Sequence, residues 1–311
     1  MKIIFFGSDD FAAVNLRRLL KTGTEVLAVI APPDKPQGRG MNVAPCLVKE
    51  CALGHDVPIL QPASLQDDQV RSELADFDAD LFIVIAYGRL LPQKILDFPR
   101  LFCLNAHASL LPKYRGAAPI NWALINGEQQ TGVTLIKMNA ALDAGDIIAQ
   151  SALSIMPEDT AVTLREKLAD LSSECLTQTL KRVDEDKVTF TAQNQNEVTW
   201  APKLTKQAGL IDWKQPAARI HGMVRGLLPW PTAHTLYDQK ILKLLKTEVV
   251  ESPAVSGSPG MVCEITAAGI LVATGRHALL IKRLHPESGR PMDAGSFISG
   301  HKLTPGYRFG T

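Results

Sequence analysis

The sequence predicts an α/β fold, in which a doubly wound, mostly parallel sheet is followed by a smaller C-terminal β-barrel that is OB-like. Through the first two hundred residues, short apolar runs alternate with helical patterns, which is typical of a doubly wound sheet. After about residue 190, short runs are separated by Gly and Pro, as in a small barrel. The chain has 311 residues, more than a single hydrophobic core usually serves, so we expect two domains.

The first domain, residues 1–190, is expected to begin with a strand whose following helix is capped by Asp9 or Asp10. The run at residues 81–86 is apolar throughout, which favours a central strand covered on both faces. We expect strands at residues 2–7, 25–31, 58–60, 81–86, 101–107, 131–138 and 146–155. We expect helices at about residues 10–23, 46–54, 67–77, 117–126 and 160–183, and a loop rich in Pro and Gly at residues 32–45.

Residues 191–206 are polar and loop-like, and we interpret them as a linker to a second domain at residues 207–311. That domain is predicted to hold one helix and five short strands. The helix covers residues 216–227, and the strands cover residues 233–237, 240–250, 261–265, 270–274 and 278–284.

Charge is distributed unevenly between the two predicted domains. Residues 207–311 hold twelve Lys and Arg against seven Asp and Glu, a net charge of +5, while residues 1–206 carry −4. A basic module suggests a polyanionic partner, although the same side chains could simply solubilise a small β domain. No apolar run approaches the roughly 18 residues of a membrane span, and the five Cys show no metal-like spacing. We therefore expect a cytoplasmic protein that binds neither a membrane nor a metal.

The first turn argues against a nucleotide cofactor. It reads Gly7-Ser8-Asp9-Asp10-Phe11, with one Gly where a dinucleotide-binding turn needs three. Carboxylates at a helix N-terminus stabilise the helix but repel phosphate. We therefore exclude a nicotinamide enzyme, even though the fold type accommodates one.

Two strand ends carry the side chains of a candidate catalytic crevice. Asn105 and His107 are two apart at the end of one apolar run, so on a strand they point to the same side. Asp143 follows the next strand, and ligands of open sheets bind beyond the carboxyl ends of the strands. Taken alone, an Asn or a His at a strand end is usually structural; the combination favours a site.

These three residues suit the transfer of an acyl group to an amine. Amide and imidazole donors can stabilise the negative charge that develops on a carbonyl oxygen, and a carboxylate can orient the imidazole or accept a proton. Ser109 lacks the Gly-x-Ser-x-Gly context of a nucleophile, so direct attack by the acceptor amine is favoured over a covalent enzyme intermediate.

At these residues the chain resembles the formyltetrahydrofolate-dependent formyltransferases. The resemblance lies in the motifs Asn105-x-His107-x-Ser109-Leu110-Leu111-Pro112, Tyr114-Arg115-Gly116-Ala117-Ala118-Pro119 and Leu142-Asp143-Ala144-Gly145-Asp146. It implies a Rossmann-like catalytic domain and 10-formyltetrahydrofolate as co-substrate. It also implies that Asn105 and His107 polarise the formyl oxygen while Asp143 supports His107 or proton movement. The folate site would include Ser109, Leu110, Leu111 and Pro112.

Within that family, the chain is similar to the members that formylate the α-amino group of initiator methionyl-tRNA. Residues 33–40 resemble an insertion that meets the acceptor end of the tRNA, where Arg39 would make contact. Met41 and Asn42 stand where many members have Lys, which lowers the positive charge of this loop. The basic C-terminal domain fits a module that holds tRNA. No obligate protein partner is implied.

Two alternatives stay open from the sequence. The same crevice could formylate a small amine, such as an amino-sugar nucleotide or glycinamide ribonucleotide. The chain could also be a non-catalytic RNA-binding protein built on an inactive α/β domain, which the presence of Asn105, His107 and Asp143 disfavours.

Overall fold

The computed structural model describes residues 1–37, 42–251 and 257–310. The chain forms two compact units, which are described one at a time below. Unit 1 contains Met1–Gly116, Gln130–Ser154 and Arg165–Trp200, and unit 2 contains Ala117–Gln129, Ile155–Leu164 and Ala201–Thr311. Each unit is therefore assembled from three stretches of sequence. The domain boundaries expected at residues 190 and 207 stay a prediction.

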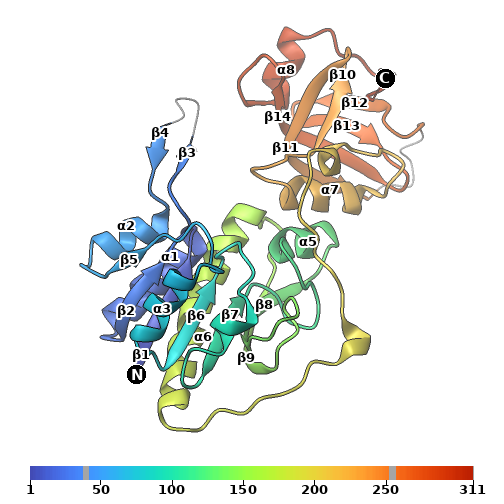
Figure 1. The fold of residues 1–311 in the computed structure, drawn as a ribbon. Helices are drawn as coiled ribbons and strands as arrows, with labels where there is room; N and C mark the ends of the chain where they lie inside the picture. Colours follow the sequence, from blue (N-terminus) through green and yellow to red (C-terminus); the bar gives the residue numbers. More distant parts are fainter. Residues whose placement is uncertain (38–41, 252–256, 311) are drawn as a thin grey trace. The chain divides into compact units, whose positions relative to one another are not determined.

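Unit 1 is built on a seven-stranded sheet, coloured blue to green in Figure 1. Its order is β5 (Ile59–Leu60), β2 (Glu25–Ile30), β1 (Lys2–Gly7), β6 (Leu81–Ile85), β7 (Phe102–His107), β8 (Gln130–Lys137) and β9 (Ile147–Ser154). The pairings from β5 to β7 are parallel, whereas β8 pairs antiparallel with both β7 and β9. Every residue of β6 is buried, as its apolar run predicted. The predicted mostly parallel α/β sheet is confirmed.

The helices of unit 1 follow the predicted pattern, with one addition. They are α1 (Asp10–Lys21), α2 (Leu47–Leu53), α3 (Asp68–Asp76), α4 (Gln93–Leu96) and α6 (Ala161–Asp184), whose first turn belongs to unit 2. Asp9 caps α1 by accepting a hydrogen bond from the backbone N–H of Ala12. The four-residue α4 was not predicted, because a single turn is too short to show a helical period.

The loop expected at residues 32–45 contains a short antiparallel pair of strands, β3 (Lys35–Gln37) and β4 (Asn42–Ala44). These strands were not predicted, because the many Pro and Gly residues of this segment are typical of a loop. A two-stranded pair tolerates a proline because each strand has a free edge, so a missing N–H need not interrupt a ladder. Arg39 and Met41 lie outside the described residues.

Unit 2 combines helices with an antiparallel sheet, which confirms the predicted C-terminal β domain. The sheet order is β10 (His234–Tyr237), β11 (Lys240–Val250), β14 (Ala278–Pro286), β13 (Gly269–Ala273) and β12 (Val262–Thr266), with β15 (Met292–Asp293) paired to β14. The α-helices are α5 (Pro119–Ile125), α7 (Ala217–Gly226) and α8 (Ala294–Gly300), and the 3-10 turn at Gln207–Gly209 precedes α7.

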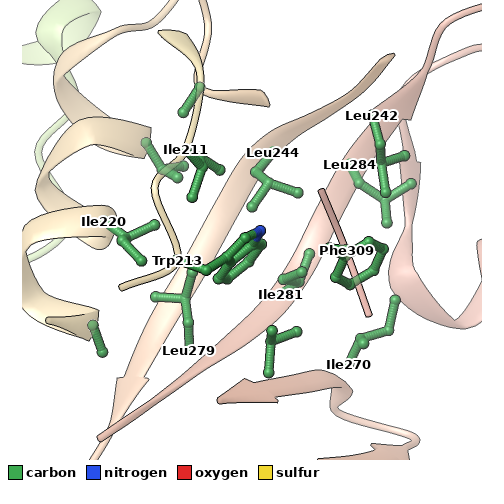
Figure 2. Close-up of a cluster of buried hydrophobic side chains, with 14 of the residues drawn as sticks. Ile211, Trp213, Ile220, Leu242, Leu244, Ile270, Leu279, Ile281, Leu284 and Phe309 are labelled. Carbon is green, nitrogen blue, oxygen red and sulfur yellow. The ribbon is translucent and has the colours of Figure 1, made fainter. Parts of the chain in front are cut away.

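The core of unit 2 fills the space between α7 and this sheet (Figure 2). Trp213 stacks on Phe309 with 5.9 Å between ring centroids, and its indole N–H donates to Thr235 Oγ1 at 3.0 Å. A buried indole needs such an acceptor, because an unpaired N–H would cost about 1–3 kcal/mol. Nearby aliphatic side chains of the strands are fully buried, among them Leu244, Ile270, Leu279 and Ile281.

Two glycines of α7 explain why residues 117–129 belong to unit 2. A Cβ at Gly222 would lie 2.7 Å from the carbonyl oxygen of Leu124, and one at Gly226 would lie 2.8 Å from that of Asn121. Helices α5 and α7 therefore pack backbone against backbone, and the Asn121 side chain donates to Gly226 O at 2.7 Å. Because of this contact, α5 belongs to unit 2, whereas the sequence predicted that residues 117–126 belong to the first domain.

Three bulk features can be stated for the described part of the chain. None of its helices is long and apolar enough to cross a membrane. Within the same residues, no group of three or more His, Cys, Asp or Glu side chains could hold a metal ion. All five cysteines are free thiols.

Candidate active site

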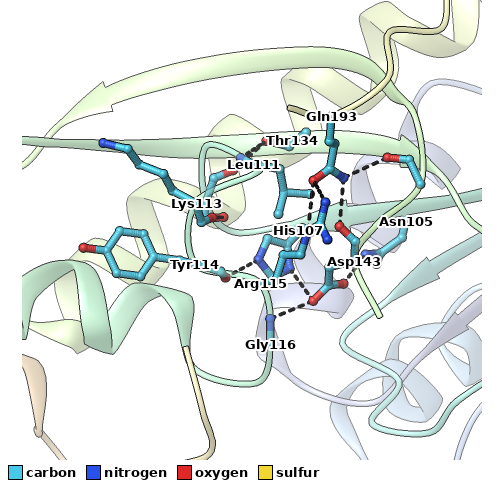
Figure 3. A network of polar contacts seen from close by, with 12 residues as sticks. Asn105, His107, Leu111, Lys113, Tyr114, Arg115, Gly116, Thr134, Asp143 and Gln193 are labelled. Carbon is cyan, nitrogen blue, oxygen red and sulfur yellow. Dashed lines mark hydrogen bonds and ion pairs between the residues drawn. The ribbon is translucent and has the colours of Figure 1, made fainter. Parts of the chain in front are cut away.

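The three predicted catalytic residues meet beyond the carboxyl end of β7 (Figure 3). Asn105 and His107 lie on β7, and Asp143 lies in the loop between β8 and β9. Asp143 Oδ2 is 3.6 Å from His107 Nδ1, and Asn105 Nδ2 donates to Asp143 Oδ1 at 3.5 Å. The structure therefore brings together side chains that are 38 residues apart in the sequence.

The loop that carries Asp143 is fixed to the end of β8. The backbone N–H of Lys137 donates to Asp146 O at 2.8 Å, and that of Met138 donates to Cys103 O at 2.8 Å. A Cβ at Gly145 would lie 1.8 Å from Lys137 O, so only glycine allows this approach. Asp143 has φ of 49°, a left-handed conformation that Asp adopts more readily than most residues.

Hydrogen bonds define the protonation of His107, whose side chain is only 7% exposed. Its Nε2 is 2.9 Å from the carbonyl oxygen of Tyr114, which can only accept, so Nε2 carries a proton. With Nε2 protonated, a neutral ring would point the lone pair of Nδ1 at the Asp143 carboxylate. A proton between Nδ1 and Oδ2 removes that repulsion. The Asp143 carboxylate is therefore placed to stabilise a positive charge on the ring, although 3.6 Å is too long for a hydrogen bond between Nδ1 and Oδ2.

The Asp143 carboxylate has one further donor. The backbone N–H of Gly116 donates to its Oδ2 at 2.9 Å. Gly116 has φ of 119°, where a side chain would be strained. The Tyr114–Gly116 segment therefore contacts both members of the His107–Asp143 pair, one through a carbonyl oxygen and the other through an amide.

Two buried residues of this network had no role assigned from the sequence. Arg115 is 4% exposed, and Gln193 is 6% exposed. Gln193 joins the Arg115 guanidinium to the backbone around Asp143, through contacts that are detailed below. The sequence offered no signal for Gln193, because it lies 50 residues after Asp143 in a stretch that reads as a polar linker.

The segment predicted to bind folate, Ser109 to Pro112, forms a rigid loop directly after β7. The Ser109 hydroxyl is fully buried and donates to Lys113 O at 2.7 Å. Thr134 Oγ1 donates to Ser109 O at 2.7 Å and accepts from the backbone N–H of Leu111 at 3.0 Å. Leu111 is buried, whereas Leu110 and Pro112 are half-buried, so these two retain surface that a ligand could contact. Folate binding by the segment stays a prediction.

A second loop follows β6 at the same edge of the sheet. The Tyr87 ring is buried and meets the Phe6 ring edge-on, with 5.5 Å between centroids. Burial raises the pKa of the Tyr87 phenol, opposed by the Arg89 guanidinium, so the hydroxyl stays neutral at physiological pH. Arg89 donates to the carbonyl oxygens of Pro62 and Ala63, which fixes this loop.

Comparison with known proteins places this geometry in a family. A model of the formyl transferase family matches residues 1–180, and one of the formyl transferase C-terminal domain matches residues 203–302. The methionyl-tRNA formyltransferase of Caldanaerobacter subterraneus subsp. tengcongensis is 45% identical, over 98% of this chain and 99% of its own. The chain belongs to the methionyl-tRNA formyltransferase family. The methionyl-tRNA formyltransferase of Geobacter metallireducens is also similar, with 42% identity over 100% of this chain and 99% of its own.

Membership of the methionyl-tRNA formyltransferase family confirms the resemblance that the sequence motifs indicated. Solved structures show the same fold at lower identity. An N-formyltransferase from Helicobacter canadensis, in complex with folinic acid and dTDP-3-aminofucose, matches with a TM-score of 0.69, 18% identity, and coverage of 94% of this chain and 100% of its own. HypX from Aquifex aeolicus, in complex with tetrahydrofolic acid, matches with a TM-score of 0.63 and 19% identity. All of this chain is covered there, but it spans only half of the length of HypX.

Proposed function

We propose that this chain transfers the formyl group of 10-formyltetrahydrofolate to the α-amino group of initiator methionyl-tRNA. The observation that carries the proposal is the 45% identity to a methionyl-tRNA formyltransferase, which extends through both units. The convergence of Asn105, His107 and Asp143 supplies the chemistry, since an amide, an imidazole and a carboxylate contact one another at the end of β7.

The reaction needs no covalent enzyme intermediate. The neutral α-amino nitrogen forms a bond to the formyl carbon, and the bond from that carbon to N10 of the folate breaks. The proton that the amine loses ends on N10, so the overall reaction consumes no acid or base. The Asp143–His107 pair is suited to relay that proton, because the imidazole and the carboxylate face each other, with 3.6 Å between Nδ1 and Oδ2.

Asn105 and His107 stabilise the negative charge that develops on the formyl oxygen. The Asn105 amide has two N–H groups, and its contact to Asp143 at 3.5 Å engages only one of them. The Nε2–H of His107 is directed at Tyr114 O, so it reaches the formyl oxygen only by leaving that carbonyl. In the arrangement described, Asn105 is the direct donor, while His107 contributes mainly its positive charge.

The remaining binding roles rest on the resemblance. Ser109 and Leu111 hold the folate loop in shape, and Leu110 and Pro112 offer it a surface. Arg39 would contact the acceptor stem of the tRNA, and the basic residues of 207–311 would contact its phosphates. No metal is required for this chemistry, because the leaving nitrogen is protonated rather than coordinated.

A direct assay tests the proposal. The purified chain is mixed with 10-formyltetrahydrofolate and methionyl-tRNA, and formyl-methionine is measured after the tRNA is deacylated. Parallel reactions offer an amino-sugar nucleotide or glycinamide ribonucleotide as acceptor. We expect formylation of the tRNA alone; preference for a small amine would overturn the substrate assignment.

Site variants test the residues separately from the substrate. We expect Asn105→Ala to lose about 10²- to 10³-fold in kcat, the usual cost of removing one oxyanion donor, and His107→Ala to lose a similar factor because it removes the positive charge near the formyl oxygen. The exposed His55 is a matched control, and His55→Ala should leave kcat unchanged. Near-normal turnover in either site variant would refute the assigned roles.

A further inference from the structure

We infer that Gln193 is a positioning residue, which holds the Asp143 carboxylate in register with His107. The inference rests on the proposed function, because it gives Asp143 its role in formyl transfer. Gln193 lies on the polar segment that the sequence marks as a linker, yet its side chain is buried against the active-site loop.

The amide of Gln193 uses its full hydrogen-bonding capacity. Its Nε2 donates to Asp143 O and to Gly145 O, both at 2.8 Å. Its Oε1 accepts from Nε and Nη2 of Arg115, at 3.0 and 2.7 Å. A guanidinium can only donate and a carbonyl can only accept, so the orientation of the amide is determined by its neighbours.

These bonds fix the carbonyl oxygens of Asp143 and of Gly145, two residues later. Without them, the left-handed conformation of Asp143 would depend on a loop whose neighbouring residues 140–142 are exposed. Gly145, which Gln193 also binds, approaches Lys137 O closely and so holds the loop against the end of β8. The Asp143 loop is therefore clamped between the end of β8 and the Gln193 amide.

Arg115 links the Gln193 amide to Gly116, the residue whose backbone N–H binds the Asp143 carboxylate. The residue after Arg115, Gly116, donates its backbone N–H to Asp143 Oδ2, and the residue before it, Tyr114, accepts from His107. Gln193 thus ties together the loop that carries the carboxylate and the loop that orients both the carboxylate and the imidazole. Loss of the tie would let the two loops shift independently.

Gln193 is itself well anchored. Thr191 exchanges two backbone hydrogen bonds with Ile147, at 2.8 and 2.9 Å. Thr199 receives the backbone N–H of Arg115 at 2.9 Å, and its hydroxyl receives that of Tyr114 at 2.8 Å. The segment is held at both ends, so the Gln193 amide has a fixed position and in turn fixes the position of Asp143.

Two substitutions separate the contacts of this amide. Gln193→Glu keeps the shape and the acceptor for Arg115, but it places an oxygen against the carbonyl oxygens of Asp143 and Gly145. Gln193→Met keeps the length and removes every hydrogen bond without adding repulsion. Gln66→Glu is the matched control, because Gln66 is exposed and contacts Ser64 and Arg71 through its backbone rather than its side chain.

The experiment measures kcat and KM for both substrates, together with thermal unfolding. We expect Gln193→Glu and Gln193→Met to lower kcat about 10- to 100-fold with KM changed less than threefold, since displacement of a catalytic group by about 1 Å costs about 10²-fold. Gln66→Glu should match the unsubstituted chain. In an Asp143→Asn background, Gln193→Glu should lower kcat no further, because the two residues act through one another.

Different results overturn different claims. Normal kcat in both Gln193 variants, with Asp143→Asn impaired, would overturn the positioning role and leave the proposed function intact. Full additivity of Gln193→Glu and Asp143→Asn would also overturn it. Normal kcat in Asp143→Asn would overturn the catalytic role of Asp143, and the inference with it.

Discussion

Replacement of Asp143 by Asn tests the electrostatic core of the site with little change of shape. The carboxylate accepts from Gly116 and faces His107 Nδ1 at 3.6 Å. At an effective dielectric constant of about 20, two unit charges at that distance interact by roughly 5 kcal/mol. The Gly116 N–H and His107 Nδ1 both face Oδ2, so an Asn that keeps its oxygen there still accepts from Gly116 but no longer places a negative charge opposite the imidazole. Part of that energy is therefore lost from a transition state that needs a positive charge or a proton near the formyl oxygen.

Since 1.36 kcal/mol corresponds to tenfold in rate, losing all of that interaction energy would lower kcat by between 10³- and 10⁴-fold. Only part of it is lost in Asp143→Asn, so we expect kcat to fall 10²- to 10³-fold. The assay is formylation of methionyl-tRNA at saturating folate, with folate binding measured separately by fluorescence. Binding should change little, because the shape of the site is retained. A kcat within tenfold of that of the unsubstituted chain would refute the imidazolium–carboxylate reasoning.

Three further predictions follow from other contacts. Gly145→Ala should lower kcat more than tenfold, because the new Cβ would displace the loop from Lys137 O. Gly295→Ala is the control and should leave kcat unchanged, because a Cβ there meets open space. Equal activity in the two variants would contradict the close approach of Gly145 to Lys137. Burial lowers the pKa of His221 to about 4, assisted by the Arg225 guanidinium and opposed by Glu248. The unfolded chain therefore takes up this proton first, near pH 6.5, and stability falls as pH drops from 6.5 towards 4. Urea unfolding gives the free energy of unfolding at pH 7.5 and at pH 5. Between these pH values, His221→Gln should lose roughly 1 kcal/mol less stability than the unsubstituted chain, after allowance for solvent screening. The same loss in both proteins would contradict the role of His221. If residues 207–311 make about five phosphate contacts, tRNA affinity should fall roughly 10²- to 10³-fold between 50 and 200 mM salt, and salt-independent binding would exclude that surface.

The sequence predicted the parts of this fold that depend on local periodicity. The apolar run of β6 and the two-residue spacing of Asn105 and His107 are both visible within a few positions, so a central strand and a strand end with two polar side chains could be anticipated. The expectation that Asp143 joins the site was right, but the strand-end argument for it was not, because β8 runs antiparallel to β7 and its carboxyl end points to the opposite edge of the sheet. The loop after β8 brings Asp143 to Asn105 and His107.

What the sequence missed depends on distant contacts. The Gln193 amide meets Asp143 across 50 residues, and nothing in a polar stretch distinguishes a buried Gln from an exposed one. The packing of α5 on α7 was missed for the same reason, because two glycines show a close approach only when the partner backbone is known. The contact of His107 with Tyr114 was also missed, since Tyr114 acts through its carbonyl oxygen rather than its side chain.

The stretch from Thr191 to Trp200 also bears on how the halves of such enzymes can be recombined. It pairs with Ile147 near its start and with Arg115 near its end, and it delivers Gln193 between them. A chimera joined at residue 190 would take this stretch from the wrong parent and mismatch it with the catalytic loop. A joint placed after Trp200 would keep this stretch and its hydrogen-bond partners in the catalytic loops from one parent. Chimeras of relatives that exchange the C-terminal half should therefore be more active when joined after Trp200 than when joined at residue 190.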